Sequence, residues 1–361
     1  MGNKKAFMAL SATLVLTIFF SIEINNFLSS LQSKKEEIYK ENGKILNSVI
    51  QIEKDRLKTI AIQLSLSSIV KQALKEGNAT TIKDEFFGVW ENLKKEGLVS
   101  EVHFFTPPST SFVNFSDFER FGHDTRESRG DMFWAMSSFK SSEHLLVCRT
   151  YPGIRATYPI EFEGELIGGI SVGKNINYIP KIIKNDFDKG SVIAYKQSPF
   201  EGMHERFKSE FLSSKTLIGD LYIDNQEGSL SKEDMQKIDF REQKQDLNID
   251  GRRYFVTNYP IFDFHKQVIG YISILNDLSE YYETFYVKEL KNLFLFLIGI
   301  SIAFLFLNKR LQKALTALKN LSTVTMSFKN KDLSALKNKN IEDFSGLIPK
   351  NEIETLQNNI L

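Results

Sequence analysis

Cysteine is nearly absent from this chain of 361 residues, which contains only Cys148. One thiol excludes an intrachain disulfide and a zinc site built from several cysteines. A basic excess is also missing, because the net charge is +1, and this argues against a nucleic-acid-binding protein. The sequence contains no HExxH, no CxxC and no complete glycine-rich phosphate loop. The five histidines are scattered. We therefore expect no enzyme, no metal site and no cofactor.

Charge is absent from two long stretches, 6–22 and 293–307. The first runs on into a helical pattern without a small-x-small cleavage site, which favours an uncleaved transmembrane anchor over a signal peptide. The second is slightly short for ~30 Å of hydrocarbon, so Lys291 and Lys309 would have to snorkel. A buried core helix is the alternative for this stretch. We predict transmembrane helices at 6–24 and 290–308.

Basic residues lie on one side of each predicted span. Lys4 and Lys5 precede the first, and Lys309, Arg310 and Lys313 follow the second. The positive-inside rule then places both termini, including residues 1–5, in the cytoplasm. The region between the spans would lie in the periplasm, so we expect a two-span protein of the bacterial inner membrane with receptor topology.

Periodicity divides the region between the spans. Apolar residues at helical spacing predict one long amphipathic helix over 27–74, ended by Glu76-Gly77-Asn78, and a second helix over 83–95. Short alternating runs follow, and Thr106-Pro107-Pro108 interrupts the first of them. Strands are predicted over 145–151, 154–162 and 165–172. We assign 25–75 to the long helix, 76–180 to a membrane-distal module and 181–289 to a membrane-proximal module.

An internal repeat supports two modules. The segment 156–172 aligns with 257–274 when one residue is inserted, and both copies read strand, Tyr-Pro-Ile, turn, Ile-Gly, strand. A helix-like segment follows each copy, at 175–184 and 278–290. Repeated supersecondary units about a hundred residues apart imply two similar modules in series. We expect Tyr158 and Tyr259 at equivalent positions of two separate sheets.

Three blocks of the first module carry a resemblance. They are 102–112 with His103 and Pro107-Pro108, 121–129 with Phe121-Gly122 and Arg129, and 152–159 with Gly153 and Arg155. With the long helix, they resemble the double Cache sensors of bacterial chemoreceptors, kinases and diguanylate cyclases. The resemblance implies a mixed α/β (α+β) fold with two tandem PAS-like modules. His123 and Ala156 depart from the family pattern, so no ligand is transferred.

The end of the chain resembles a HAMP relay. Leu311, Leu315 and Leu318 begin a helix with coiled-coil-like spacing, and 351–360 looks like the second HAMP helix. Glu352 and Leu356 are its expected signalling residues within the segment 309–361. The arginine-proline pair usual after the membrane is missing.

Three arginines of the matched stretch are the first candidates for ligand contact, and two further residues are weaker ones. A guanidinium group donates two parallel hydrogen bonds to a carboxylate, so we predict a small organic acid such as formate or lactate. An amino acid is the alternative, with Asp124 or Asp131 holding its ammonium group. Structural ion pairs with Asp124, Glu127 or Asp131 would also explain Arg149 and Arg155. Phe133, Trp134 and Tyr151 fit either a pocket or the core. The candidates are Arg129, Arg149, Arg155, Thr110 and His103.

These features predict a homodimeric chemosensory receptor in the lipid bilayer. A small extracytoplasmic ligand would shift the helices, and the HAMP-like segment would relay this to a chemotaxis signalling domain with its adaptor and kinase. That domain would lie in a longer receptor or on a separate polypeptide. Two alternatives remain: the sensor part of a histidine kinase or diguanylate cyclase, and a membrane anchor that senses nothing.

Overall fold

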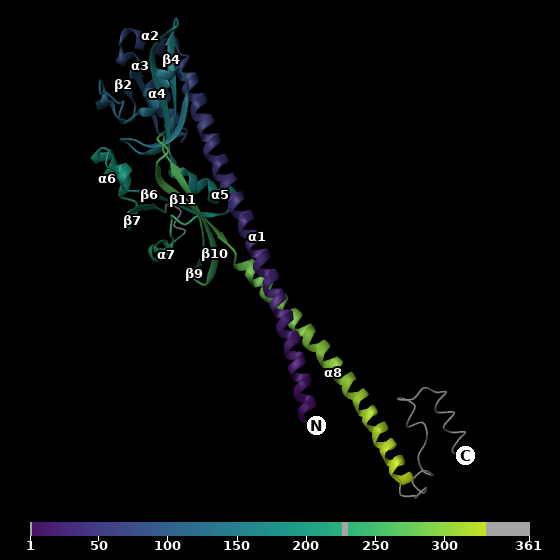
Figure 1. Cartoon of the computed structure of the whole chain (residues 1–361). Helices are drawn as coiled ribbons and strands as arrows, with labels where there is room; N and C mark the ends of the chain where they lie inside the picture. The colour runs from purple at the N-terminus through teal and green to yellow at the C-terminus, as the bar shows by residue number, and fades with distance from the viewer. Residues whose placement is uncertain (1, 226–229, 330–361) are drawn as a thin grey trace. The chain divides into compact units, whose positions relative to one another are not determined.

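The computed structural model describes residues 2–225 and 230–329 of the chain (Figure 1). The chain divides into two units, Leu28–Glu280 and Met1–Phe27 with Tyr281–Leu361, and each is described by itself. The first unit contains two antiparallel sheets with the helices that pack on them. The long N-terminal helix, the mixed helix-and-sheet class and the two sheets expected from the sequence are therefore confirmed.

The N-terminal helices differ from the sequence prediction in one place. Helix α1 spans Gly2–Ser65, and a break at Leu66 and Ser67 separates it from α2 (Ser68–Glu76). The predicted single helix over 27–74 is therefore wrong beyond Ser65. The apolar spacing continues across the break, but the Ser67 hydroxyl accepts the Val70 N–H and starts a new helix. Gly77 ends α2 as predicted, with φ of 68°.

Helix α3 spans Ala79–Lys95 and begins earlier than the predicted Lys83. Its start is fixed by Asn78, whose side-chain oxygen accepts the Thr81 N–H at 3.3 Å.

The first module is a five-stranded sheet in the order β2-β1-β5-β4-β3. The Pro-Pro sequence interrupts the chain between its first two strands, as predicted, because proline cannot donate to the ladder. The short helix α4 was not predicted, because the apolar residues 132–136 are consecutive and show no helical spacing. In the structure Met132, Ala135 and Met136 form its buried face, whereas Phe133 and Trp134 are 39% and 42% exposed. The elements are β1 (Glu101–Thr106), β2 (Thr110–Asn114), η1 (Phe118–Arg120), α4 (Gly130–Ser138), β3 (Ser142–Val147), β4 (Pro152–Phe162) and β5 (Glu165–Asn175).

The second module is a six-stranded sheet in the order β7-β8-β6-β11-β10-β9. Its central strands β6, β11 and β10 correspond to β1, β5 and β4 of the first module. The elements from the connection onward are η2 (Ile176–Tyr178), α5 (Ile179–Phe187), β6 (Gly190–Lys196), η3 (Ser198–Phe200), α6 (Glu205–Leu212), β7 (Thr216–Ile218), β8 (Leu221–Asp224), α7 (Lys232–Gln236), β9 (Lys244–Ile249), β10 (Arg252–Phe262) and β11 (Val268–Asp277).

The internal repeat is confirmed by strand register. Tyr158 pairs with Ile170 across β4 and β5, and Tyr259 pairs with Ile272 across β10 and β11. In both hairpins the register shifts directly after the isoleucine of Tyr-Pro-Ile. The two tyrosines therefore occupy equivalent positions in two related sheets.

One apolar core joins both modules to α1. Leu57 and Ala61 of α1, which are fully buried, belong to the same cluster as Ile170 and Ile272 of the two sheets. Polar contacts add to this attachment: the Tyr259 hydroxyl donates to the Tyr39 carbonyl, and Asn42 donates to Thr257 at 3.0 Å. The part of α1 beyond Leu28 is thus an integral layer of the first unit.

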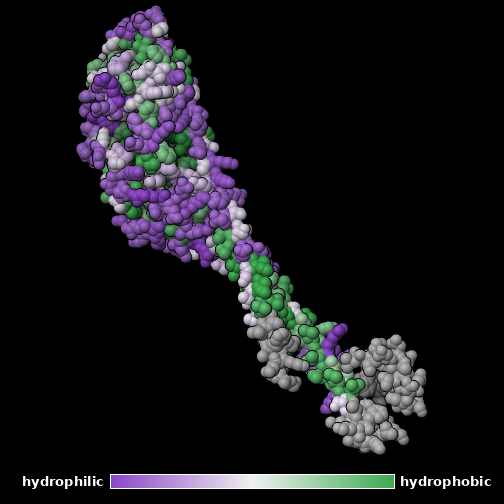
Figure 2. All heavy atoms as spheres, viewed as in Figure 1, coloured by the Kyte–Doolittle hydropathy of each residue, from purple (hydrophilic) through white to green (hydrophobic). Residues whose placement is uncertain are grey.

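The second unit contains helix α8 (Ser279–Lys329) and the beginning of α1. Phe27 stacks on Phe285 with ring centroids 3.7 Å apart, so the two helices touch. Thr13–Ser65 and Ser279–Ser322 contain stretches long and apolar enough to cross a membrane. Hydrophobic residues cover much of the described part of this unit, with Leu305 67% exposed, whereas the sheet unit is mainly hydrophilic on the face shown (Figure 2). Glu352, Leu356 and most of the predicted HAMP-like segment lie outside the described residues.

Candidate functional site

A row of polar side chains occupies one face of the first sheet. Glu101 and His103 alternate along β1, and cross-strand pairing places Ser171 of β5 opposite His103. Arg155 of β4 is two positions away, opposite Gly173. Because side chains alternate between the faces of a sheet, these residues share one face, and the apolar Val102, Phe104, Ile170 and Val172 occupy the other.

The charged members of this face are almost completely buried. Arg155 is 0% and Glu101 is 3% exposed, and the arginine Nη1 donates to the Glu101 Oε2 at 2.7 Å. Arg129, just before α4, covers the same face and is 1% exposed. Its Nε and Nη2 donate to the two oxygens of Asp131 at 2.9 and 2.8 Å, and Nη2 also donates to Ser171 at 2.7 Å. We call Glu101, His103, Arg129, Asp131, Arg155 and Ser171 the buried charged site.

Mutual attraction keeps these groups ionised. Burial raises the pKa of Glu101, but Arg155 and His103 more than offset it, and the pKa lies well below its usual value. Burial likewise opposes ionisation of Asp131, and Arg129 holds its pKa below the usual range. Burial lowers the pKa of His103 to about 4, although Glu101 acts in the opposite direction. His103 is therefore neutral at neutral pH, and two arginines balance two carboxylates.

The second module provides an internal comparison. In the repeat, Ser171 corresponds to Ser273 and Gly173 corresponds to Leu275. The residues that pair with them on the neighbouring strands therefore correspond as well: His103 is equivalent to Val192, and Arg155 is equivalent to Val256. Val192, Val256 and Leu275 all belong to an apolar cluster. Aliphatic side chains thus occupy the positions of the second module that correspond to Arg155 and His103, although Ser273 and Asn258 keep buried polar groups on the same face. Burying charges opposes folding unless they are paired, so the fold itself does not require them here.

Two buried polar atoms at this site, the hydroxyl of Tyr151 and the Nε of Arg155, have no hydrogen-bond partner among the described residues. The Nδ1 of His103 lies 3.4 Å from the Glu101 Oε1. Tyr151 lies between β3 and β4, and the Arg155 guanidinium lies 4.5 Å from its ring centroid. Both reach over Gly173, where a Cβ would come within 2.8 Å of the Tyr151 hydroxyl and 2.9 Å of the Arg155 Nη1. A buried polar group that lacks a partner inside a polar cluster can be satisfied by a water molecule or by a ligand.

The comparisons with known proteins identify the family. Residues 32–282, more than half of the chain, match the model of dCache_3, described as the double sensory domain of two-component sensor kinase. The chain belongs to the dCache_3 family. This confirms the predicted Cache-type sensor. Among curated proteins, none matches the sequence.

Three solved structures that are similar to this dCache_3 chain are distant from it in sequence. The sensor domain of the V. cholerae histidine kinase DctB is 14% identical with a TM-score of 0.40, covering 68% of this chain and 98% of that one. The Campylobacter jejuni chemoreceptor Tlp3 sensory domain with isoleucine bound is 8% identical with a TM-score of 0.39, covering 70% and 95%. The ligand-binding domain of Mlp24 with asparagine is 15% identical with a TM-score of 0.28, covering 69% and 98%.

Of the five residues predicted to contact a ligand, the structure brings three together and places two elsewhere in the dCache_3 domain. Arg129, Arg155 and His103 come together in the buried charged site. Arg149 lies apart, with its Nε 3.5 Å from the Asp117 carboxylate, and lines a cavity of about 200 Å³ between the two modules. Thr110 begins β2 and forms a bridge with Asp124. Arg149 and Arg155 do form ion pairs, but their partners are Asp117 and Glu101 and not the three acidic residues suggested by the sequence. Asp131 pairs with Arg129 instead.

The sequence did not point to Glu101 or Ser171 as site residues, and it did not show that Tyr151 lies against the Arg155 guanidinium. Glu101 precedes Arg155 by 54 residues, and no spacing rule pairs residues across a sheet at that distance. The usable signal for Ser171 was its place beside Gly169 and Gly173 in a strand. Gly169-Ile-Ser-Val-Gly173 also fits the GxSxG pattern of hydrolases, but Ser171 lies within β5 and not on a strand-to-helix turn. Within 2–225 and 230–329, no group of three His, Cys, Asp or Glu side chains is placed to bind a metal ion.

Proposed function

We propose that this chain is the sensing part of a transmembrane receptor and that its buried charged site binds a small carboxylic acid. The observation that carries the proposal is the contrast between the modules: the buried charge of Arg155 and the buried polar side chain of His103 occupy positions where the repeat has Val256 and Val192. Charges buried without structural need are expected where a protein binds a polar molecule. The dCache_3 family, a family of sensory domains, supports this role.

The ligand class follows from the groups that lack partners. The Arg155 Nε is a hydrogen-bond donor, and the Tyr151 hydroxyl stays protonated because burial raises its pKa. A ligand that satisfies them must supply acceptors, as a carboxylate does. The two carboxylates considered as acceptors for the ammonium group of an amino acid are already paired. Both Asp131 oxygens already accept from Arg129, and Asp124 is half exposed in a pair with Arg126.

The proposed receptor spans the inner membrane twice, with the sheet unit in the periplasm and both termini in the cytoplasm. Support comes from the two apolar helices and from the basic residues that flank the second of them. We propose that the receptor acts as a homodimer and catalyses no reaction in this chain. The ligand would shift the equilibrium between two conformations through its differential affinity for them.

The last part of the proposal concerns the signalling domain that receives the signal from this sensor. The HAMP-like pattern around Glu352 and Leu356 led to the expectation of a chemotaxis signalling domain with its adaptor and kinase. The family description names two-component sensor kinases and favours a histidine kinase as the second candidate. Phosphotransfer from ATP to a histidine in the full-length product of the gene would distinguish a kinase from a chemotaxis receptor.

Calorimetry on residues 28–280 tests the binding proposal with formate, L-lactate, amino acids and sugars as titrants. We expect heat of binding with an acid and at least roughly tenfold weaker binding for Arg155→Lys, since charge-assisted hydrogen bonds contribute about 1.5–3 kcal/mol each. Arg149→Lys is the matched control, because Arg149 lies outside the buried charged site. Binding that weakens only in the Arg149 variant would contradict the proposed position of the ligand.

A further inference from the structure

The two repeated hairpins differ at their tips. The β4–β5 hairpin turns through Glu163 and Gly164, both with positive φ (54° and 84°). The β10–β11 hairpin is longer by the one residue that the repeat alignment requires, and its tip contains Phe264 and His265. This longer turn is ordered by its own bonds: Asp263 N–H donates to the Gln267 carbonyl at 3.0 Å, and Gln267 N–H donates to the Asp263 carboxylate at 2.8 Å.

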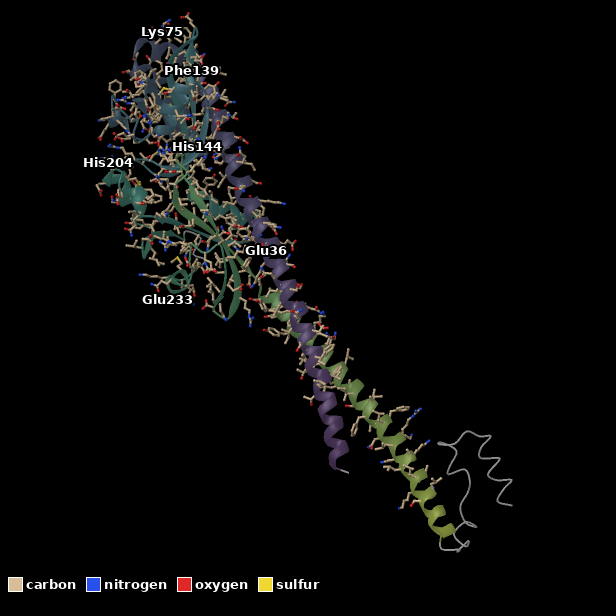
Figure 3. All side chains as sticks on the ribbon, viewed as in Figure 1. Glu36, Lys75, Phe139, His144, His204 and Glu233 are labelled. Atoms are coloured by element: carbon tan, nitrogen blue, oxygen red, sulfur yellow. The ribbon has the colours of Figure 1, made fainter. Side chains whose placement is uncertain are left out.

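The two tips contact different surroundings. The β4–β5 tip meets α2, where Lys75 pairs with Glu163 at 2.9 Å. The β10–β11 tip reaches the first module, where the Phe264 ring packs edge-on against His144 with centroids 4.9 Å apart. Figure 3 labels both partners: Lys75 lies at the far end of the first module, and His144 lies where the two modules meet.

The residues that receive the β10–β11 tip are neighbours of the buried charged site. His144 pairs directly with Arg155 across β3 and β4. The His265 imidazole lies against Gly130, 3.6 Å from the position of a Cβ there, and Gly130 separates Arg129 from Asp131 in the chain. Asp131, Phe264 and His265 also line the cavity between the modules. The inserted tip therefore touches the backbone segments that hold both buried arginines.

We propose that Phe264 and His265 are positioning residues that couple the buried charged site to the second module. A backbone movement at Arg129 or Arg155 on ligand binding would carry Gly130 or β3 with it, and either shift would displace the tip through His265 or through His144 and Phe264. The tip continues directly into β11, which ends immediately before α8. This inference rests on the proposed sensing role of the site, and such coupling is reciprocal, because each partner biases the other equally.

Hydrogen exchange on the full chain in lipid nanodiscs tests the coupling without any ligand. Replacing both Phe264 and His265 by alanine should speed amide exchange in 129–138 by roughly tenfold, a change of about 1.4 kcal/mol in local opening. Asp131→Asn, which weakens the ion pair with Arg129 inside the site, should speed amide exchange in 261–269 by a similar factor. Lys75→Ala, which removes the contact of the equivalent tip in the first module, is the matched control and should change neither segment.

Two outcomes would overturn the proposal. One is unchanged exchange in 261–269 for a folded Asp131→Asn variant, which decides the question even where the alanine double variant does not fold. The other is an equal response to Lys75→Ala, which would indicate general loosening. Adding formate or L-lactate to the parent chain separates the two proposals. Coupling between variants with no effect of either acid would count against the ligand class and leave the coupling intact.

Discussion

The strongest prediction concerns the stability of the buried charged site. Arg155→Met removes the cation while keeping most of the side-chain volume, and it leaves Glu101, 3% exposed, without its main counter-charge. Breaking one partner of a buried ion pair costs about 3–5 kcal/mol. For a unit of this size, that loss lowers the melting temperature by roughly 10 °C.

The pH dependence gives this prediction a second test. Because the pKa of Glu101 is lowered in the folded parent, its pair contributes stability above the unfolded pKa that is lost as the pH falls below it. Without Arg155, burial dominates and Glu101 takes up a proton more readily. The difference between parent and variant should thus be largest at neutral pH and should shrink toward about pH 4.

Urea unfolding of residues 28–280, followed by circular dichroism, measures the effect. Adding Glu101→Gln to Arg155→Met should restore most of the lost stability, because the second change removes the uncompensated charge. Arg241→Met, which breaks an exposed pair with Asp220, is the control and should have little effect. A single variant as stable as the parent, or a double variant no better than the single, would refute the reasoning.

Three further predictions concern titration, packing and topology. Because the folded pKa of His103 is lowered, the parent should lose about 3 kcal/mol of stability as the pH falls from 6.5 to about 4, and His103→Gln should remove this loss. Unfolding free energies measured across this pH range test the prediction, and a parent with no such loss would contradict the lowered pKa of His103. Gly173→Ala should destabilise by about 1–3 kcal/mol because its Cβ would meet Tyr151 and Arg155, whereas Gly88→Ala on exposed α3 should not; thermal melts compare them. Periplasmic reporter fusions should be active after Gly251 and inactive after Leu356, and activity in the reverse order would end the receptor proposal.

The sequence was informative where local chemistry decides structure. The Tyr-Pro-Ile repeat predicted two related hairpins because turn residues and alternation are local signals, and the register around Tyr158 and Tyr259 confirms them. The break before α2 was missed because Ser67 interrupts an apolar pattern that is otherwise continuous. The pairing of Arg155 with Glu101 was beyond reach, because it depends on which strands neighbour β5 in the folded sheet.

The two modules fill corresponding positions of one fold in different ways. In the second module, Val192, Val256 and Leu275 place aliphatic side chains on this face, and these stabilise by removing apolar area from water. In the first module, equivalent positions hold His103 and Arg155, which stabilise little and leave the Arg155 Nε without a partner among the described residues. A module that only supported its neighbour would gain by keeping the aliphatic set. The first module instead maintains a charged interior beside an inserted hairpin tip, and this combination is expected of a site that detects a polar ligand and reports it to the second module.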